Sequence, residues 1–149
     1  MPRLRAADWP STRKHALLTV ALGTRTETNM AMPHAATGEV VDLRPLGSGL
    51  KQARTTAIIK TKTFEAVRLI VREGATIASH QVPGPIMLHC LEGQVLLGLS
   101  GSDVELSAGQ WICLDGGERH SLRGVQDSSL LLTILFVGEQ GAARSVGAD

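Results

Sequence analysis

Histidine and cysteine are the residues of this 149-residue chain that could do chemistry, and there are few of them. The sequence holds five histidines and two cysteines, and it contains no tyrosine. It also lacks the GxGxxG and P-loop patterns of nucleotide sites, the GxSxG pattern of a serine nucleophile and the HExxH pattern of a zinc site. Three or four converging His, Cys or carboxylate side chains are needed to hold a metal ion. Chemistry therefore depends on which of these residues the fold brings together.

The body of the chain, residues 39–138, has the pattern of short β-strands. Residues with branched or aromatic side chains are frequent, several stretches alternate apolar with polar residues, and glycine recurs every few positions. No stretch has apolar residues at helical spacing between helix caps. The predicted strands are 54–61, 64–72, 76–81, 85–91, 94–99, 104–107, 110–114, 120–125 and 130–137. Strands of this number and spacing predict an all-β sandwich or barrel.

Two patterns of glycine and histidine in this region resemble the two sequence motifs of the cupin superfamily. The first motif reads G-x5-H-x-H-x3,4-E-x6-G, and the second reads G-x5-P-x-G-x2-H-x3-N. The resemblance covers residues 39–137 and implies an all-β cupin double-stranded β-helix, a jelly-roll barrel with a pocket between its two sheets. The matching residues are Gly74, His80 and Gly93 in the first motif, and Gly109, Gly117 and His120 in the second.

The same resemblance implies where a divalent metal would bind. Many cupins hold one through two His and a Glu of the first motif and one His of the second. His80 and His120 match two of these positions, but Val82 stands where the second His would be and Ile86 where the Glu would be. Aliphatic side chains cannot donate to a metal, so we expect no full metal site.

Strand parity limits which residue could replace the missing ligands. His89 follows Ile86 by three positions, and an odd offset places it on the opposite face of the strand. Cys90 follows Ile86 by four positions and shares its face. The spacing therefore allows a metal site made of His80, Cys90 and His120, and it predicts that His89 lies outside the barrel.

Three functions remain open at this point, and the sequence does not decide whether the chain is an enzyme. The first is a small cupin-like domain whose apolar pocket binds an unidentified small molecule without a full metal site. The second is a metal-dependent dioxygenase or isomerase that uses His80 and His120 and a divalent metal. The third is an interaction or assembly module that binds no ligand. The predicted pocket wall consists of His80, Val82, Ile86, Leu88, Cys90 and His120.

Composition limits the partners. The net charge of +1 and the aromatic share of 3% argue against nucleic-acid binding. No run approaches the roughly 20 apolar residues that span a membrane. Cupins are commonly dimers, so the resemblance implies a homodimer, and the strand at 54–61 could pair across it.

The ends of the chain differ from its body. Residues 1–38 carry five Lys or Arg against two acidic residues, and we predict that they form a disordered basic extension. Residues 138–149 are predicted to be a flexible tail. Cys90 and Cys113 both lie in apolar runs, which is typical of free buried thiols in the reducing cytoplasm.

Overall fold

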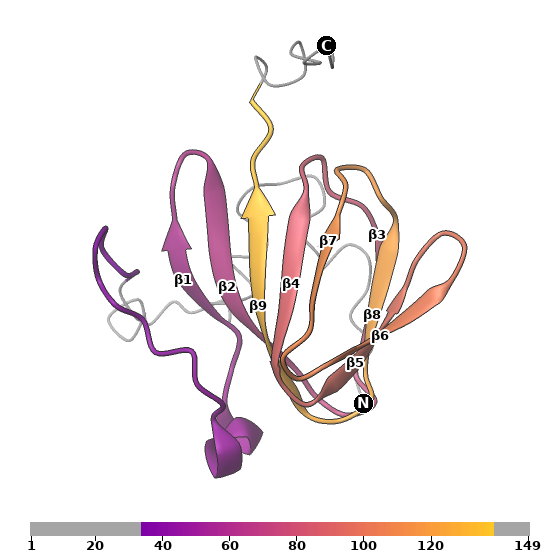
Figure 1. Ribbon diagram of the computed structural model, residues 1–149, viewed down its shortest axis with the longest axis horizontal. Coiled ribbons are helices and arrows are strands. Elements are labelled where there is room, and N and C mark those ends of the chain that lie inside the picture. The colour runs from indigo at the N-terminus through magenta and orange to yellow at the C-terminus, as the bar shows by residue number, and fades with distance from the viewer. Residues whose placement is uncertain (1–33, 139–149) are drawn as a thin grey trace, which may run out of the picture.

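The computed structural model describes residues 34–138, and this part of the chain is built almost entirely from β-strands (Figure 1). One short 3-10 helix, η3 (Gly47–Gln52), precedes the first strand. All nine predicted strands are present, with ends within two residues of the expected ones. They are β1 (Thr56–Lys60), β2 (Phe64–Val71), β3 (Thr76–His80), β4 (Ile86–Glu92), β5 (Gln94–Gly98), β6 (Asp103–Ser107), β7 (Trp111–Leu114), β8 (His120–Gly124) and β9 (Ser128–Leu135).

The strands form two antiparallel sheets. The five-stranded sheet has the order β1-β2-β9-β4-β7, and the four-stranded sheet has the order β3-β8-β5-β6. Figure 1 shows the five-stranded sheet toward the viewer, with the other sheet behind it and to the right. Because the chain passes from one sheet to the other several times, its nine strands make a jelly roll. The predicted all-β jelly-roll fold is confirmed.

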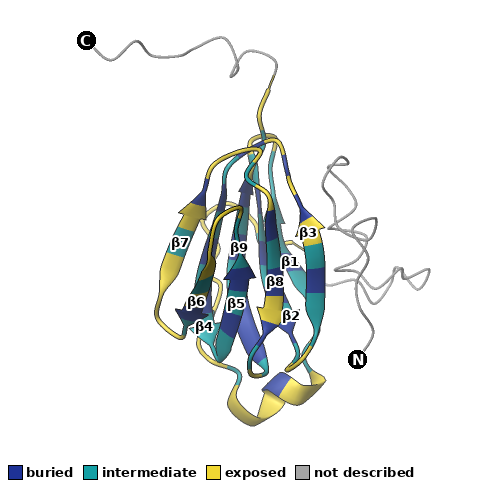
Figure 2. Cartoon of the chain, turned by 90° about the vertical axis from the view of Figure 1, so that its right-hand side faces the viewer, coloured by how far each residue is buried: buried dark blue, intermediate teal, exposed yellow. Residues whose placement is uncertain are grey.

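The core lies between the sheets because alternate residues of each strand point inward. Along β2, for example, Val67, Leu69 and Val71 are buried, while the residues between them are half-buried. Figure 2 shows this alternation as dark-blue bands along the strands. Burial of these apolar side chains is the main term that stabilises such a sandwich.

Tight loops at one end of the jelly roll fix the ends of β3 and β8. A side chain at Gly84 would collide with the carbonyl oxygen of Leu135, and one at Gly116 would collide with that of Pro83. Gly117 has φ of 81°, which favours glycine, and its N–H donates a hydrogen bond to the Val82 carbonyl (2.7 Å). The loop after β3 is therefore held against the loop before β8.

The predicted N-terminal extension and C-terminal tail lie largely outside the described residues. Of the extension, residues 34–38 are described, and the N–H of Ala35 donates a hydrogen bond to the carbonyl oxygen of Ile58 in β1 (2.8 Å). Within residues 34–138, no helix has the length and apolar character that crossing a membrane would require.

Glu65 is an exception in the inward row of β2. Its side chain is 1% exposed, and its Oε1 accepts no hydrogen bond within the described residues. Burial raises the pKa of the Glu65 carboxyl, and the charge of nearby Lys60 opposes this rise. A buried carboxyl of this kind is more stable protonated than ionised.

Replacing Glu65 with glutamine should therefore stabilise the protein at alkaline pH. The Glu65 carboxyl has a higher pKa in the folded state than in the unfolded state, because ionisation is costlier in the folded state. The unfolding free energy of the wild type therefore falls as the pH rises from the lower of these two pKa values through the higher one. The Glu65→Gln variant lacks this fall. Urea unfolding at about pH 4 and about pH 8 checks it. Equal pH slopes in the two proteins would contradict the buried, protonated state.

Candidate functional site

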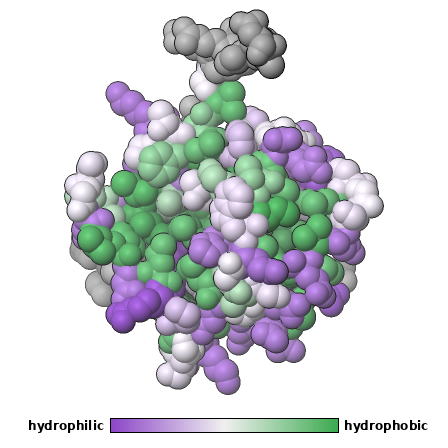
Figure 3. Space-filling model, viewed as in Figure 1, coloured by the Kyte–Doolittle hydropathy of each residue, from purple (hydrophilic) through white to green (hydrophobic). Residues whose placement is uncertain are grey.

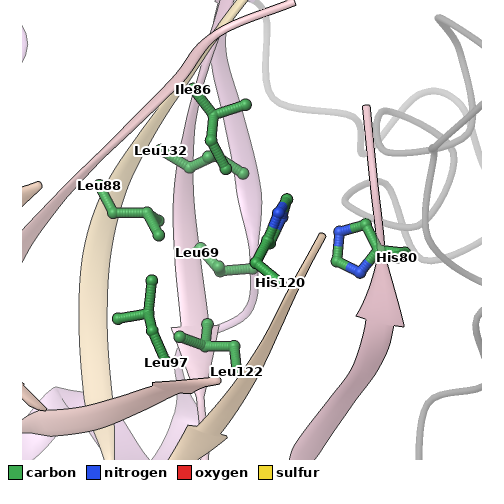
Figure 4. Close-up of a pocket in the computed structure, with 8 residues that line it drawn as sticks. All are labelled: Leu69, His80, Ile86, Leu88, Leu97, His120, Leu122 and Leu132. Atoms are coloured by element: carbon green, nitrogen blue, oxygen red, sulfur yellow. The ribbon is translucent and has the colours of Figure 1, made fainter. Parts of the chain in front are cut away.

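Two histidines from neighbouring strands meet inside the jelly roll. His80 ends β3, His120 begins β8, and the two residues are paired in the antiparallel ladder. Their ring centroids lie 4.3 Å apart in an edge-on arrangement, with 67° between the ring planes (Figure 4). The side chains are 4% and 3% exposed. The structure thus brings together the two histidines that the cupin motifs single out.

A register shift in β3 gives His80 its inward direction. Ile77 pairs with Leu122, and His80 pairs with His120, so three steps along β3 match two steps along β8. In a regular strand, residues 77 and 80 would point to opposite faces. The extra residue reverses the parity, and both Ile77 and His80 are buried.

The hydrogen bonds of the two rings define their tautomer. His80 Nδ1 lies 2.8 Å from the carbonyl oxygen of Ala78, and His120 Nδ1 lies 2.9 Å from that of Glu118. A carbonyl oxygen only accepts, so each Nδ1 must carry the proton and donate it. In the neutral ring, Nε2 then carries the lone pair. Both imidazoles are acceptors at Nε2.

Both rings are neutral near pH 7. Burial lowers the pKa of His80 to about 4, against a smaller raising effect of its hydrogen bond to the Ala78 carbonyl. Burial likewise lowers the pKa of His120, against the raising effect of its bond to Glu118. The cause is the apolar surroundings, which disfavour the charged imidazolium.

The histidines line a small cavity between the sheets. Its volume is about 10 Å³, which is close to the space that one water molecule needs. Figure 4 shows the rings beside a wall of aliphatic side chains. The lining residues are Leu69, His80, Ile86, Leu88, Leu97, His120, Leu122 and Leu132.

Four of the six predicted pocket residues line this cavity, namely His80, Ile86, Leu88 and His120. Val82 and Cys90 are buried in the core but are not part of the cavity wall. Four leucines of the cavity wall, on β2, β5, β8 and β9, were not among the predicted pocket residues. Strand alternation is the signal that marks them as inward residues, but it does not show which inward residues border a cavity.

The structure does not bring Cys90 to His80 and His120, the arrangement that the spacing allowed for a metal site. Cys90 does face inward with Ile86, as its parity predicted, but four residues along a strand amount to about 13 Å. Its thiol donates to the carbonyls of Glu92 and Gly93 (3.5 and 3.6 Å), and burial raises its pKa. Within residues 34–138, no three His, Cys, Asp or Glu side chains lie close enough to hold a metal ion.

His89 lies outside the barrel, as its parity predicted. It is half-buried on the outer face of β4, between Trp111 of β7 and Leu131 of β9. Cys90 and Cys113 are both free thiols. Cys113 is exposed, so the expectation that it is a buried core thiol is wrong.

The donors around the histidines do not fit the full metal site of the cupin motifs. A catalytic zinc ion uses three protein ligands, and this cavity offers two imidazoles and otherwise aliphatic side chains. Ile86, which occupies the motif's Glu position, lies in the cavity wall and presents only carbon there. The Nδ1 bonds to carbonyls do orient both rings as in metal-binding histidines.

Comparison with known proteins identifies the fold. No family model and no curated protein matches the sequence. Solved structures do match: a conserved protein of unknown function from Streptococcus pyogenes has a TM-score of 0.58 at 18% identity, over 72% of this chain and 96% of that one. A cupin superfamily protein from Desulfitobacterium hafniense has a TM-score of 0.58 at 13% identity, over 69% of this chain and 100% of that one. The cupin domain of Schizosaccharomyces pombe Cnp3 has a TM-score of 0.55 at 16% identity, over 64% and 72%.

This chain therefore has the fold of the cupin superfamily, as its two motifs indicated. The similarity shows the fold, and it carries no activity over to this chain.

The buried histidines should make the protein less stable in acid. As the pH falls below about 6.5, the His80 imidazole becomes protonated in the unfolded chain but stays neutral in the folded one, because burial lowers its pKa there. The unfolding free energy therefore falls. For His80 alone the loss between about pH 7.5 and about pH 5 is about 2 kcal/mol. Urea unfolding of wild type and His80→Leu at both pH values measures it.

The exposed residue His34 provides the control. His34→Leu should lose as much unfolding free energy between the two pH values as the wild type does. In His80→Leu this loss should be smaller by about 2 kcal/mol. If His80→Leu kept the full sensitivity, the ring would not be buried in its neutral form.

Proposed function

We propose that this chain is a small-molecule-binding protein whose site is the His80–His120 cavity and which works without a full metal site. One observation carries the proposal: two neutral imidazoles, both of the Nδ1–H tautomer, border the same otherwise apolar cavity. A few polar groups converging in an apolar pocket are the usual form of a small-ligand site.

The hydrogen-bond acceptors of the site determine which chemical group of a ligand it can bind. Because Nε2 of each neutral ring accepts a hydrogen bond, the matching group is a neutral donor such as a hydroxyl or an amide N–H. A carboxylate offers no proton, and its charge would be costly beside the six aliphatic side chains. An alcohol or an amide therefore fits better than an organic acid.

The size of the cavity adds a second condition. At about 10 Å³ it accepts one water-sized group, whereas sites for larger ligands measure several hundred Å³. We infer that the ligand inserts a single polar group between the histidines. A bulkier part of the same molecule would require the surrounding leucines to move.

Native mass spectrometry and thermal unfolding of the full chain test this function. We expect ethanol and acetamide to raise the melting temperature and acetate to leave it unchanged. His80→Leu and His120→Leu should abolish the rise, because each removes one acceptor. His89→Leu on the outer face is the matched control and should respond like the wild type.

Two results would overturn the proposal. The first is a melting temperature that none of the probes changes, combined with spectra that contain no small-molecule adduct. The second is one divalent metal ion per chain that is lost in His120→Leu, which would favour the metal-dependent enzyme.

An assembly module is the second candidate, and the nearly filled interior favours it. Six of the eight residues around the cavity are aliphatic, and the space they leave is about that of one water molecule. A jelly roll with no room for a ligand can still act through its outer surfaces. Absence of any ligand response together with stable self-association would support this reading over the first.

A further inference from the structure

Three side chains with soft donor atoms lie on the outer side of the five-stranded sheet. Met87 and His89 of β4 and Cys113 of β7 supply a thioether, an imidazole and a thiol. Residues 86, 88 and 90 of β4 are buried, so the half-buried Met87 and His89 between them point outward. Cys113 is exposed. We call these three residues the outer soft-donor cluster, and none of them lines the histidine cavity.

We propose that the outer soft-donor cluster binds one Cu(I) ion. The proposal goes beyond small-molecule binding in the cavity and does not depend on it. Thiolate and thioether ligands select Cu(I), and imidazole also suits copper. The thiolate is the form of cysteine that ligates a metal, so the Cys113 thiol releases its proton to solvent when the ion binds. The copper stays in the same oxidation state throughout.

The strand register places the two sulfur-bearing residues directly opposite each other. Met87 pairs with Cys113 in the antiparallel ladder of β4 and β7. The Cys90 N–H donates a hydrogen bond to the Gln110 carbonyl (2.9 Å), so the even-numbered residues of β4 form the hydrogen-bonded pairs of this ladder. Met87 and Cys113 are therefore a non-hydrogen-bonded pair. In such a pair the Cα atoms are about 4.5 Å apart and the side chains lie closest.

His89 occupies the next outward position of β4. It lies about 7 Å from Met87 along the strand and about 7–8 Å diagonally from Cys113. Long and aromatic side chains reach across such diagonals. Methionine has three rotatable bonds, so its sulfur can adapt to the position of the other two donors. The three donors can thus converge on one ion above the two strands.

The donors of the cluster are not engaged elsewhere in the described chain. Within residues 34–138 neither the His89 ring nor the Cys113 thiol makes a hydrogen bond or an ion pair. By contrast, the Cys90 thiol donates to two backbone carbonyls, and the rings of His80 and His120 are each bonded at Nδ1. Metal binding at the cluster therefore breaks no bond between these residues.

The surroundings of the cluster favour a soft ion over zinc. Its outward neighbours in the same two rows are Thr133, Leu131 and Trp111, which bring no carboxylate. Figure 3 looks onto this side of the molecule and shows hydrophobic side chains mixed with hydrophilic ones. In the part of the chain that the structure describes, no three His, Cys, Asp or Glu side chains are grouped closely enough for a metal ion, so zinc lacks its usual ligands here. The cluster reaches three donors only by using the methionine sulfur, which suits Cu(I).

A competition titration of the reduced full chain tests the proposal. Without oxygen, the wild type should withhold one Cu(I) per chain from the coloured chelator bicinchoninate. Cys113→Ser, Met87→Leu and His89→Leu each remove one donor and should weaken binding at least about 10-fold, because even residues that only orient a ligand have effects of this size. Thr133→Val changes the residue beside Met87 on β9 and is the matched control, so it should bind like the wild type.

Alkylation of Cys113 gives a second readout, which needs no variant. One equivalent of Cu(I) should slow the reaction of this exposed thiol with a maleimide at least about 10-fold, whereas Zn(II) should slow it far less. The same protection should be lost in Met87→Leu and His89→Leu, where the thiol has one partner fewer.

Three results would each overturn the proposal. The first is a wild type that withholds no Cu(I) or whose Cys113 the ion does not protect. The second is unchanged affinity in both Met87→Leu and His89→Leu, which would mean that the thiol binds alone. The third is a loss in Thr133→Val as large as in Cys113→Ser. His120→Leu should still bind Cu(I), so failure of the cavity and failure of the copper site are distinguishable.

Discussion

The alternation of side chains between the two faces of a strand is the constraint on which this structure depends. In β4 it sends Ile86 and Leu88 into the core and Met87 and His89 to the outside. The histidine pair depends on one break in that alternation. The extra residue in β3 turns His80 to the inside, where it meets His120. Without this bulge, one imidazole would face solvent and the pair would not form.

The apolar wall determines the chemistry that the histidines can perform. Aliphatic neighbours hold both rings neutral near pH 7, and the carbonyls of Ala78 and Glu118 fix the proton on Nδ1. The result is a pair of acceptors rather than a pair of acids. Ile86 stands where the cupin motif has a carboxylate, so the cavity lacks that metal ligand. Its aliphatic side chain also adds to the apolar surroundings that keep both rings uncharged.

The inner side of the five-stranded sheet is apolar, whereas its outer side carries polar residues such as Arg68, His89 and Thr133. The inner side packs against the second sheet and leaves a cavity of about 10 Å³. The outer side leaves Trp111 exposed, while nearby Arg68 and Glu92 are held by segments of the same chain. An antiparallel sheet needs only one apolar face to build a core, and here that face is the inner one.

The sequence by itself determined where the strands lie and which way most of their side chains point. Turn-forming glycines and branched residues mark all nine strands, and a two-residue period follows from backbone geometry alone, as His89 shows. Only the tertiary structure decided which inward residues meet. Cys90 points to the same side of β4 as Ile86 but lies too far along the strand to reach the histidines. The bulge before His80 cannot be predicted from strand alternation. Distance along a strand, register and cavity volume depend on how the two sheets pack, and no local pattern encodes that.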